Sequence, residues 1–397
     1  MASTQPVLAL EGITVVSLEH AIAAPLATRH LADQGARVIK VERPGSGDFA
    51  RAYDARVDGL ASHFVWVNRS KESLALDLKQ PEAQEILMKL LAEADVLVQN
   101  LAPGAAARLG LSFEALAAKN PKLIVCDISG YGEGGPYTEK KAYDLLIQSE
   151  AGFLSITGTP DEQVKAGISI ADIAAGMYAY TNILAALIER GKTGRGRRIE
   201  IAMIDAMVEW MGFPMYYAYE GQEPPRRTGA SHATIYPYGP FRAGDGRTVM
   251  LGLQNEREWA VFCDKLLGDA ALTTDVRFAS NALRTANREV LSKLIEHNFA
   301  SLSADEVMAR LDAADIANAN VSTMNDIWNH PQLAARQRWT SVDTPSGRVP
   351  ALQPPGMGGE HPARMGPVPA LGEHTAAILR ELGYAVHADE LRDRKVV

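Results

Sequence analysis

Short apolar runs alternate with amphipathic segments along the first 130 residues of the chain. The runs are rich in Val, Ile and Leu, and the segments between them carry apolar residues at helical spacing. We predict strands at 13–19, 36–43, 95–100 and 123–129, and helices at 24–35, 81–94 and 112–121. Consecutive strand–helix–strand units build a parallel sheet. The pattern therefore predicts an α/β fold with a doubly wound, mostly parallel sheet.

A longer amphipathic segment follows, ending at Arg190 and Gly191. Its apolar residues recur every three or four positions and comprise Ile173, Met177, Tyr180, Ile183, Leu184, Leu187 and Ile188. This spacing predicts a helix, with Asp172 at or just before its first turn. The positive end of the helix dipole favours an ionised, nucleophilic carboxylate there. Asp172 is therefore either the N-cap of this helix or a nucleophile.

The carboxyl ends of the predicted strands are the expected ligand-binding edge of such a sheet. They comprise 19–22, 42–43, 100–101 and 129–131. Basic residues concentrate near the first of these ends and comprise Arg37, Lys40, Arg43, Arg51, Arg69, Lys71 and Lys79. Such a cluster suits a polyanionic small ligand, although a solvated basic face is an equal alternative.

Several common cofactor sites do not fit the sequence. A dinucleotide fold places G-x-G-x-x-G after its first strand, but this chain has EHAIAAP, so NAD is disfavoured. The GKT at 191–193 follows a helix and lacks the first glycine of a P-loop. The nine histidines show no HEXXH spacing, so we expect no metal site.

A second, smaller α+β domain is predicted in the middle of the chain. A Pro- and Arg-rich stretch at 221–241 marks the crossing into it. The segment FRAGDGRTVMLGLQ predicts a hairpin with Asp245 and Gly246 in its turn, and amphipathic helices are expected from Glu256 to about Leu311.

Composition is that of an ordinary soluble protein of about two domains. The net charge of -8 argues against nucleic-acid binding, and no signal peptide or membrane span is visible, so we expect a cytoplasmic protein without a membrane partner. Cys126 and Cys263 lie in apolar or amphipathic contexts and are predicted to be reduced core residues.

Ordered motifs from Leu10 to the C-terminus carry a family resemblance. They include LEGITVVSLEH, PLATRHLADQGARVIKVERPGSGDFAR, NRSKESLALDLK, ADVLVQNLAPGAAARLGLS, ISGYGEGGPY, AYDLLIQSEAG and LGEHTAAILRELGY. Together they resemble the family III CoA-transferases, the group of formyl-CoA and carnitine CoA-transferases. The resemblance implies a large CoA-binding and catalytic domain at 1–222, completed by 339–397, and a small domain with its linkers at 223–338. It also implies that two such chains form an interlocked homodimer.

The resemblance further implies a catalytic role for Asp172. Its carboxylate would attack an acyl-CoA thioester, and the reaction would pass through an aspartyl-acyl anhydride and an aspartyl-CoA thioester. Coenzyme A, as a thioester substrate, would be the only cofactor. By position in the motifs, the residues that resemble the CoA-binding set are Arg43, Leu76, Lys79, Asn100, Leu101, Arg108, Lys141, Tyr143 and Asp144.

Other positions bear on the choice of reaction. Racemases of the same family have histidine at the position of Tyr143, and tyrosine is a poor base at neutral pH. Formyl-CoA transferase has glutamine at the position of Ile22 and tryptophan at that of Tyr53, so specificity for oxalate and formate is in doubt. His20, at the end of the first strand, is either a substrate contact or a hydrogen-bonded wall residue.

The segment RRTGASHATIYPYG resembles the branch that acts on itaconate, mesaconate and citramalate. Arg226, Arg227 and His232 would clamp the remote carboxylate of a short dicarboxylic acid, or the arginines merely cap a linker. The hypotheses are CoA transfer from a donor such as succinyl-CoA to a dicarboxylate, racemisation or isomerisation of an acyl-CoA, and CoA binding without catalysis.

Overall fold

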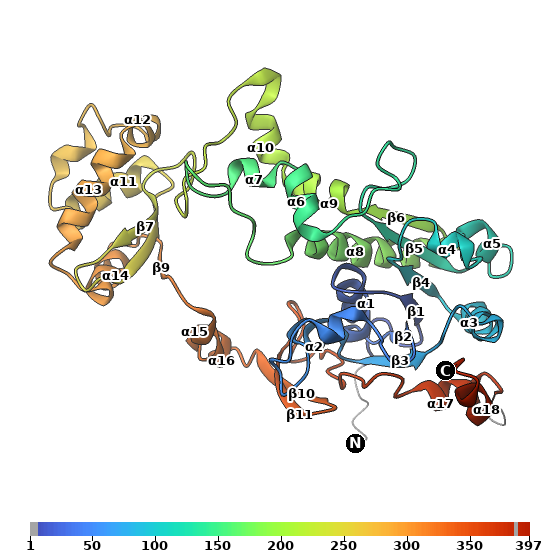
Figure 1. Cartoon of the computed structure of the whole chain (residues 1–397). Helices are drawn as coiled ribbons and strands as arrows, with labels where there is room; N and C mark the ends of the chain where they lie inside the picture. Colours follow the sequence, from blue (N-terminus) through green and yellow to red (C-terminus); the bar gives the residue numbers. More distant parts are fainter. Residues whose placement is uncertain (1–6, 385–387) are drawn as a thin grey trace. The chain divides into compact units, whose positions relative to one another are not determined.

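The computed structural model describes residues 7–384 and 388–397, which form two compact units (Figure 1). The first unit runs up to Ala151 and adds Gly167–Met211 and the chain from Pro331 onward. The second unit comprises Gly152–Ala166 and Gly212–His330. Each unit has its own sheet and its own hydrophobic core.

The first unit is built on a six-stranded sheet of order β3-β2-β1-β4-β5-β6, in which every pairing is parallel. Its strands are β1 (Thr14–Leu18), β2 (Arg37–Glu42), β3 (Lys71–Ala75), β4 (Val96–Gln99), β5 (Ile124–Ser129) and β6 (Arg198–Ala202). The order reverses between β1 and β4, and open α/β sheets bind ligands at such a switch point. The predicted α/β fold is confirmed.

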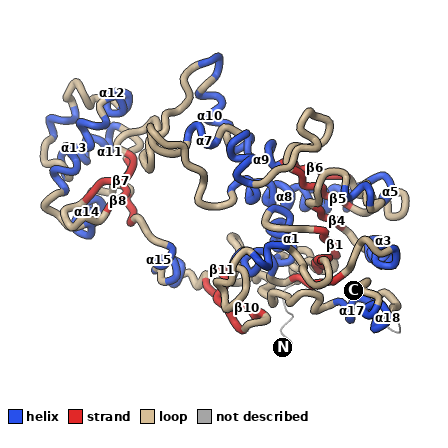
Figure 2. The backbone as a smooth tube through the Cα atoms, in the orientation of Figure 1, coloured by secondary structure: helices blue, strands red, loops and turns tan. Residues whose placement is uncertain are grey.

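Helices cover both faces of this sheet (Figure 2). On one face, α1 (Ala23–Asp33) packs along α8 (Ile170–Thr193). Gly176 allows this close approach, because a β-carbon there would lie 2.6 Å from the carbonyl oxygen of Ala23. On the other face, α3 (Pro81–Glu93), α5 (Phe113–Ala117) and α17 (Thr375–Glu381) share a core with alternate strand residues such as Val16 and Leu18.

The predicted long helix exists, but it ends later than expected. It continues to Thr193, and Gly194 supplies a left-handed C-cap at φ 71° whose N–H donates to the carbonyl of Arg190 at 2.8 Å. In the described part of the chain, α8 alone has the length and composition to cross a membrane. It packs against α1, α9 (Met203–Trp210), β5 and β6, as a core helix does.

The first unit is completed by short elements around the sheet. They are η1 (Phe49–Ala52), α2 (Ser62–Asn68), α4 (Ala105–Arg108), α6 (Asp144–Glu150), α16 (Pro331–Ala335), β10 (Trp339–Thr344), β11 (Gly347–Leu352) and α18 (Ala388–Asp393). The antiparallel β10–β11 hairpin packs Val342 and Val349 against Ala61 and Phe64, next to and within α2. The end of the chain therefore belongs to the same unit as its beginning.

The second unit is smaller and mixes helices with an antiparallel sheet. The predicted hairpin is confirmed as β7 (Tyr238–Arg242) and β8 (Thr248–Gly252), and β9 (Asn318–Asn320) pairs with β8. The predicted helical series is confirmed as α11 (Glu256–Lys265), α12 (Asn281–Ala286), α13 (Arg288–Phe299) and α14 (Ala304–Ala313). The remaining elements are α7 (Phe153–Ile156), α10 (Gly212–Tyr217), η2 (Tyr219–Gly221), η3 (Ala270–Thr273) and α15 (Met324–Trp328). Trp259, Phe262 and Phe299 are fully buried in its core.

Candidate active site

Asp172 lies in the first turn of α8, but it does not cap the helix. The N-cap residue, Ser169, makes no side-chain cap hydrogen bond. Instead, Asp144 Oδ1 accepts from the backbone N–H groups of Ala171 at 2.8 Å and of Asp172 at 3.3 Å. Within the described residues, the carboxylate of Asp172 has no hydrogen bond or ion pair. The N-cap alternative for Asp172 is therefore wrong, because Asp144 performs that task from α6.

The charge state of Asp172 also differs from the expectation based on the helix dipole. Burial, and then the nearby negative charge of Asp144, raises the pKa of Asp172 to about 7. Desolvation disfavours the ionised carboxylate, which is opposite in sign to the effect expected from the dipole at the start of α8. A pKa of about 7 makes the ionisation of this side chain sensitive to pH in the neutral range.

Two tyrosines lie in the neighbourhood of this carboxylate. Burial, and then the charges of Asp48, Asp172 and Tyr143, raises the pKa of Tyr53. Tyr143 immediately precedes α6, and its side chain is 69% exposed. The structure therefore brings together Tyr53, Tyr143, Asp144 and Asp172, four of the residues selected from the sequence.

The loop between β1 and α1 borders the same region. The N-terminus of α1 contacts Gly176, four residues or about 6 Å along α8 from Asp172. His20 and Asn100 are joined across the switch point by two hydrogen bonds, from His20 N to Asn100 Oδ1 and from Asn100 Nδ2 to the His20 carbonyl, both at 2.9 Å. The side chain of Ile22 is buried. Asn100 thus holds the His20 backbone, and Ile22 packs inside the protein, so both side chains have structural roles.

The basic cluster found in the sequence separates into two sets. Lys40, Lys71 and Arg69 are buried and bonded to carboxylates, so they do not present charge to a ligand. Arg37 and Arg51 are also ion-paired, with Glu72 and Glu42. The expectation that the whole cluster faces a polyanion is therefore wrong.

Four predicted CoA-binding cations remain available. They are Arg43, Lys79, Arg108 and Lys141, all exposed, and none forms an ion pair in the described residues. Leu76, by contrast, has its side chain in the hydrophobic core, so that only its backbone can reach a ligand. Leu101 follows β4, and its N–H donates to Gln99 Oε1 at 2.8 Å.

The three candidates in the second unit differ in what they offer. The Arg227 guanidinium donates to the carbonyls of Ser155, Thr159 and Pro160, so it holds that loop. Arg226 is exposed and has no side-chain partner in the described residues. His232 Nδ1 accepts from the N–H groups of Thr234 and Ile235, which places the ring proton on Nε2 as a free donor. Its ring stacks on Tyr238.

A cavity of about 520 Å³ lies beyond the ends of β4 and β5. Its apolar lining includes Leu101, Pro103 and Phe113, whereas its charged lining is mostly acidic. The acidic members are Glu114, Asp127, Glu133, Glu139 and Glu200, with Arg198 as the basic one. Because like charges repel, this cavity suits an uncharged part of a ligand and not a phosphate.

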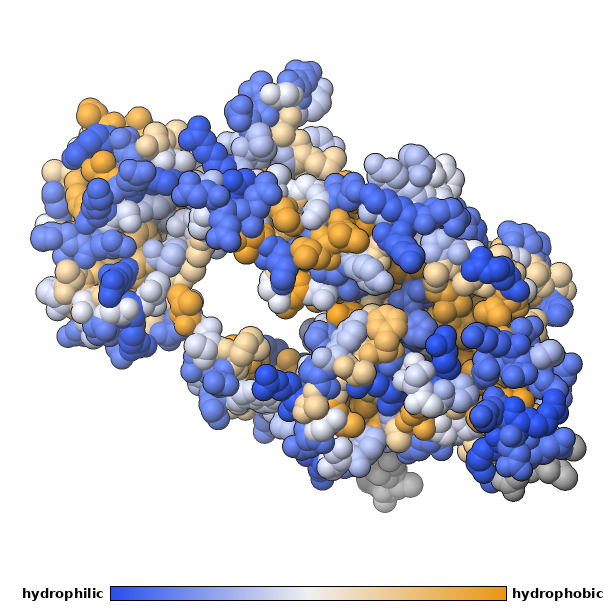
Figure 3. All heavy atoms as spheres, viewed as in Figure 1, coloured by the Kyte–Doolittle hydropathy of each residue, from blue (hydrophilic) through white to orange (hydrophobic). Residues whose placement is uncertain are grey.

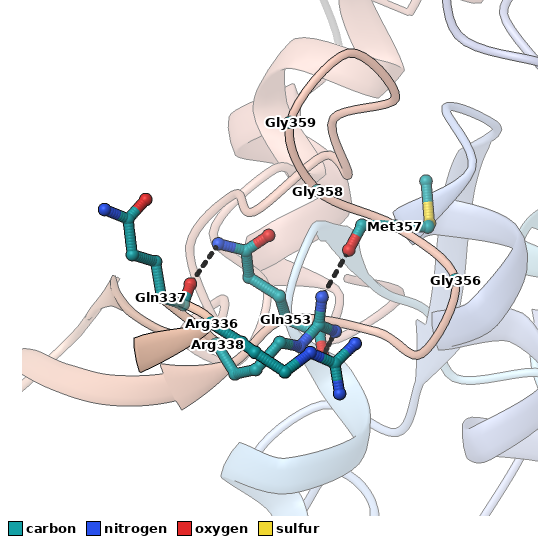
Figure 4. Close-up of a pocket in the computed structure, with 8 residues that line it drawn as sticks. All are labelled: Arg336, Gln337, Arg338, Gln353, Gly356, Met357, Gly358 and Gly359. Carbon is teal, nitrogen blue, oxygen red and sulfur yellow. Dashed lines mark hydrogen bonds between the residues drawn. The ribbon is translucent and has the colours of Figure 1, made fainter. Parts of the chain in front are cut away.

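A second pocket, of about 360 Å³, lies where β10 begins (Figure 4). Arg336 and Arg338 extend into it beside the glycine-containing loop 356–359. Arg338 donates to the carbonyls of Gln353, Pro354 and Met357, so its charge fixes this loop. No residue predicted from the sequence lines this pocket. Nor does the described part of the chain contain a group of three or more His, Cys, Asp or Glu side chains suited to a metal.

Asp48 and Gln148 belong to this site but were not among the residues predicted from the sequence. Asp48 is fully buried and bonded to Lys40, and Gln148 Nε2 donates to Asp144 Oδ2 at 2.7 Å. The available signals were Asp48 in GSGDFAR and the four-residue spacing between Asp144 and Gln148 on one helix face.

Comparison with known proteins gives a consistent result. A family model described as CoA-transferase family III matches residues 10–375. The succinate–glutarate CoA-transferase of Agrobacterium fabrum is 35% identical, covering 94% of this chain and 95% of that protein. The succinyl-CoA:mesaconate CoA-transferase of Haloarcula hispanica is 33% identical, covering 94% and 96%. The crystal structure of a CAIB/BAIF family protein from Brucella suis aligns with a TM-score of 0.83 at 36% identity, covering 95% and 100%.

Proposed function

Because this chain belongs to CoA-transferase family III, we propose that it moves coenzyme A from an acyl-CoA donor, preferably succinyl-CoA, to a short dicarboxylic acid. The observation that carries this proposal is the position of Asp172. Its carboxylate is bonded to no other group in the described residues, while Asp144 caps the helix that bears it. A carboxylate whose helix is capped by another residue can serve, in its ionised form, as the nucleophile.

The first half of the reaction releases the donor acid. A carboxylate oxygen of Asp172 attacks the thioester carbon, the C–S bond breaks, and CoA leaves as the thiolate. The thiolate then attacks the aspartyl carbon of the mixed anhydride. This step expels the donor acid as a carboxylate and leaves an aspartyl-CoA thioester on the enzyme.

The second half repeats these steps with the acceptor. The acceptor carboxylate attacks the aspartyl thioester, and CoA again leaves as the thiolate. The thiolate then attacks the acceptor carbonyl of the new anhydride, which forms the product thioester and regenerates the Asp172 carboxylate. No proton is gained or lost overall. Exclusion of water protects both anhydrides from hydrolysis.

The charged residues support the binding of CoA and of a diacid. Arg43, Lys79, Arg108 and Lys141, which form no ion pair within the described residues, offer four cations for the phosphates of CoA. Arg226 and His232 remain the candidates for the remote carboxylate of the acid, because each has a side-chain donor without a partner in the described part of the chain. Two relatives, a succinate–glutarate and a succinyl-CoA:mesaconate CoA-transferase, support the choice of dicarboxylates.

We also propose that the protein functions as a homodimer. Large apolar side chains are exposed in each unit, and Figure 3 shows apolar groups at the surface. In the first unit they include Ile168, Ile188 and Trp210, and in the second Phe213, Tyr216 and Met324. Exposed apolar surface of this kind favours association with a second copy. Light scattering at micromolar concentration should give twice the chain mass, and a stable monomer would contradict the dimer.

An acceptor panel tests the proposed reaction. The enzyme is incubated with succinyl-CoA and glutarate, mesaconate, itaconate, citramalate or a monocarboxylate of similar length, and the CoA products are identified by mass spectrometry. We expect dicarboxylyl-CoA products and little product from the monocarboxylate. Deuterium entry at the α-carbon of an acyl-CoA without any acceptor, and without transfer, would instead identify a racemase.

Two variants of neighbouring arginines sharpen this experiment. Arg226→Ala should raise the apparent KM for the dicarboxylate much more than for the monocarboxylate. Arg227→Ala should lower thermal stability without that selectivity, because Arg227 is already bonded to three carbonyls. Equal KM effects of Arg226→Ala on both acids would remove Arg226 from acid recognition.

A further inference from the structure

Asp48 joins three segments of the chain at the carboxyl ends of the strands, near Asp172. Its carboxylate is fully buried in the loop after β2. Oδ1 accepts from the N–H groups of Ala21 at 3.2 Å and Ala50 at 2.9 Å, and Oδ2 accepts from Lys40 Nζ at 2.8 Å. One side chain therefore links the β1–α1 loop, strand β2 and η1.

Lys40, the ion-pair partner of Asp48, has further hydrogen bonds of its own. Lys40 is fully buried, and its Nζ also donates to the carbonyl and the carboxylate of Glu19, at 3.3 and 3.4 Å. Glu19 in turn accepts from Lys71 Nζ at 2.7 Å. Buried charges persist only when each has partners of opposite sign in good geometry. This network therefore fixes the direction from which Asp48 approaches its two backbone N–H groups.

The β1–α1 loop depends on Asp48 for its conformation. Ala21 has φ 61°, a left-handed conformation that costs a residue with a β-carbon about 1 kcal/mol. Its N–H is directed to Asp48, while the neighbouring His20 backbone is bonded to Asn100 on the other side. The His20 ring stacks on Phe49 with centroids 5.3 Å apart, and its Nδ1 is 3.8 Å from Asp48 Oδ1.

Asp48 also organises the segment that carries Tyr53. It is the N-cap of η1, and Tyr53 directly follows that helix. The start of α1, which follows the His20 loop, contacts Gly176, one turn along α8 from Asp172. The negative charge of Asp172 also contributes to the raised pKa of Tyr53. Two of the three residues chosen from the sequence as substrate contacts in the first unit, His20 and Tyr53, are thus set in place by one carboxylate.

We propose that Asp48, fixed by Lys40, is a positioning residue for CoA transfer. It holds the His20 loop and the Tyr53 segment in the positions that reaction at the nucleophile Asp172 requires. The proposal rests on the proposed function, since it assigns Asp48 to the same site. Asp48 is not in contact with the reacting atoms; it acts through Ala21, His20 and η1. Because a shift of about 1 Å in a reacting group can cost about 100-fold in rate, loosening these segments should lower kcat.

The test compares two buried carboxylates. Asp48→Asn removes the negative charge that pairs with Lys40. Asp33→Asn makes the same change at the far end of α1, where Asp33 is buried and bonded to Arg69. Both variants should lose thermal stability. Only Asp48→Asn should lower kcat by about 10-fold or more, with KM for acyl-CoA changed less than about 3-fold.

A measurement independent of activity accompanies the kinetics. Hydrogen exchange followed by mass spectrometry on the peptide that contains 19–24 reports on the Ala21 N–H. Exchange should be faster in Asp48→Asn than in wild type, and unchanged in Asp33→Asn. Transfer by the wild type tests the proposed function, whereas the exchange difference tests the positioning role even if no transfer is found.

Two results would overturn the proposal. One is an unchanged kcat in folded Asp48→Asn. The other is unchanged exchange at 19–24. If Asp48→Asn does not fold, the double variant Lys40→Met with Asp48→Asn removes both charges of the pair and is the better folder. Wild-type kcat in that folded double variant would equally contradict a positioning role, and a lowered kcat with fast exchange at 19–24 would support it.

Discussion

Asp144 Oδ1 accepts a hydrogen bond from the backbone N–H of Asp172 at 3.3 Å, so one carboxylate caps the helix that carries the other. The same arrangement places the two negative charges close together, and Asp144 contributes to the raised pKa of Asp172. Capping and charge are therefore two separable functions of Asp144, because an amide retains the first and loses the second.

Asp144→Asn should move the pH dependence of transfer to lower pH. Removal of a like charge favours the ionised form of Asp172, so its pKa should fall, by up to about one unit because burial remains the larger cause. The profile of kcat/KM against pH measures this shift, and Asp144→Ala should in addition destabilise α8 by about 1 kcal/mol. A profile that moves to higher pH would contradict the charge relation.

Asp172→Asn should make the protein more stable at pH 8. The folded pKa of about 7 lies above the unfolded value near 3.8, so the folded state holds its proton more tightly. The contribution of Asp172 to the free energy of unfolding is therefore greatest below about pH 4. It falls as the pH rises to about 7 and stays low at higher pH. At pH 8 the free energy of unfolding, measured by denaturant titration, should therefore be about 1–3 kcal/mol higher for the variant than for wild type. At pH 4 we expect no such gain. A variant less stable than wild type at pH 8 would contradict the burial argument.

Two glycines of α8 should respond in opposite ways to alanine. Gly176→Ala places a β-carbon 2.6 Å from the Ala23 carbonyl, so we expect a loss of about 1–3 kcal/mol and a lower kcat as α1 is displaced. Gly191 has open space around it, so Gly191→Ala should stabilise the helix by about 0.5–1 kcal/mol and leave kcat unchanged. Urea unfolding and kinetics of both variants check this, and equal effects would contradict the packing of α1 on α8.

We expect KM for the acyl-CoA to depend on the exposed cations that form no ion pair among residues 7–384 and 388–397, and not on the ion-paired ones. Arg43→Ala should raise KM for the acyl-CoA by about 10- to 150-fold, as expected for loss of a hydrogen bond to a charged group. Arg37→Ala removes a half-exposed arginine paired with Glu72 and Glu381, so KM should not change and stability should fall by less than about 1 kcal/mol. An unchanged KM in Arg43→Ala would remove Arg43 from the CoA site.

Much of the fold was predictable because β1, β4 and β5 are largely apolar runs. The two missed strands of the large sheet, β3 and β6, are its edge strands. β3 carries Lys71 and Glu72, and β6 carries Arg198 and Glu200, so neither strand is a continuous apolar run. Short, partly charged strands give little periodic signal.

The candidate site was predictable only in part. Asp172 was found because a helix start and a family motif coincide there. The burial that raises its pKa depends on packing and could not be read from the sequence. In the same way, Lys40 and Lys71 looked like ligand-facing cations until their buried partners were known. Asp48 was missed because its contacts with Ala21 and Lys40 exist only in the folded chain.

The most direct test of the account is chemical trapping at Asp172. The wild-type enzyme is incubated with succinyl-CoA, quenched with hydroxylamine and digested, and peptides are analysed by mass spectrometry. Hydroxylamine captures an activated acyl group but not a free carboxylate, so a hydroxamate should appear at Asp172 and be absent from Asp172→Asn, which should also be inactive. No hydroxamate at Asp172 in an active enzyme, or substantial transfer by Asp172→Asn with deamidation excluded by mass, would contradict the mechanism.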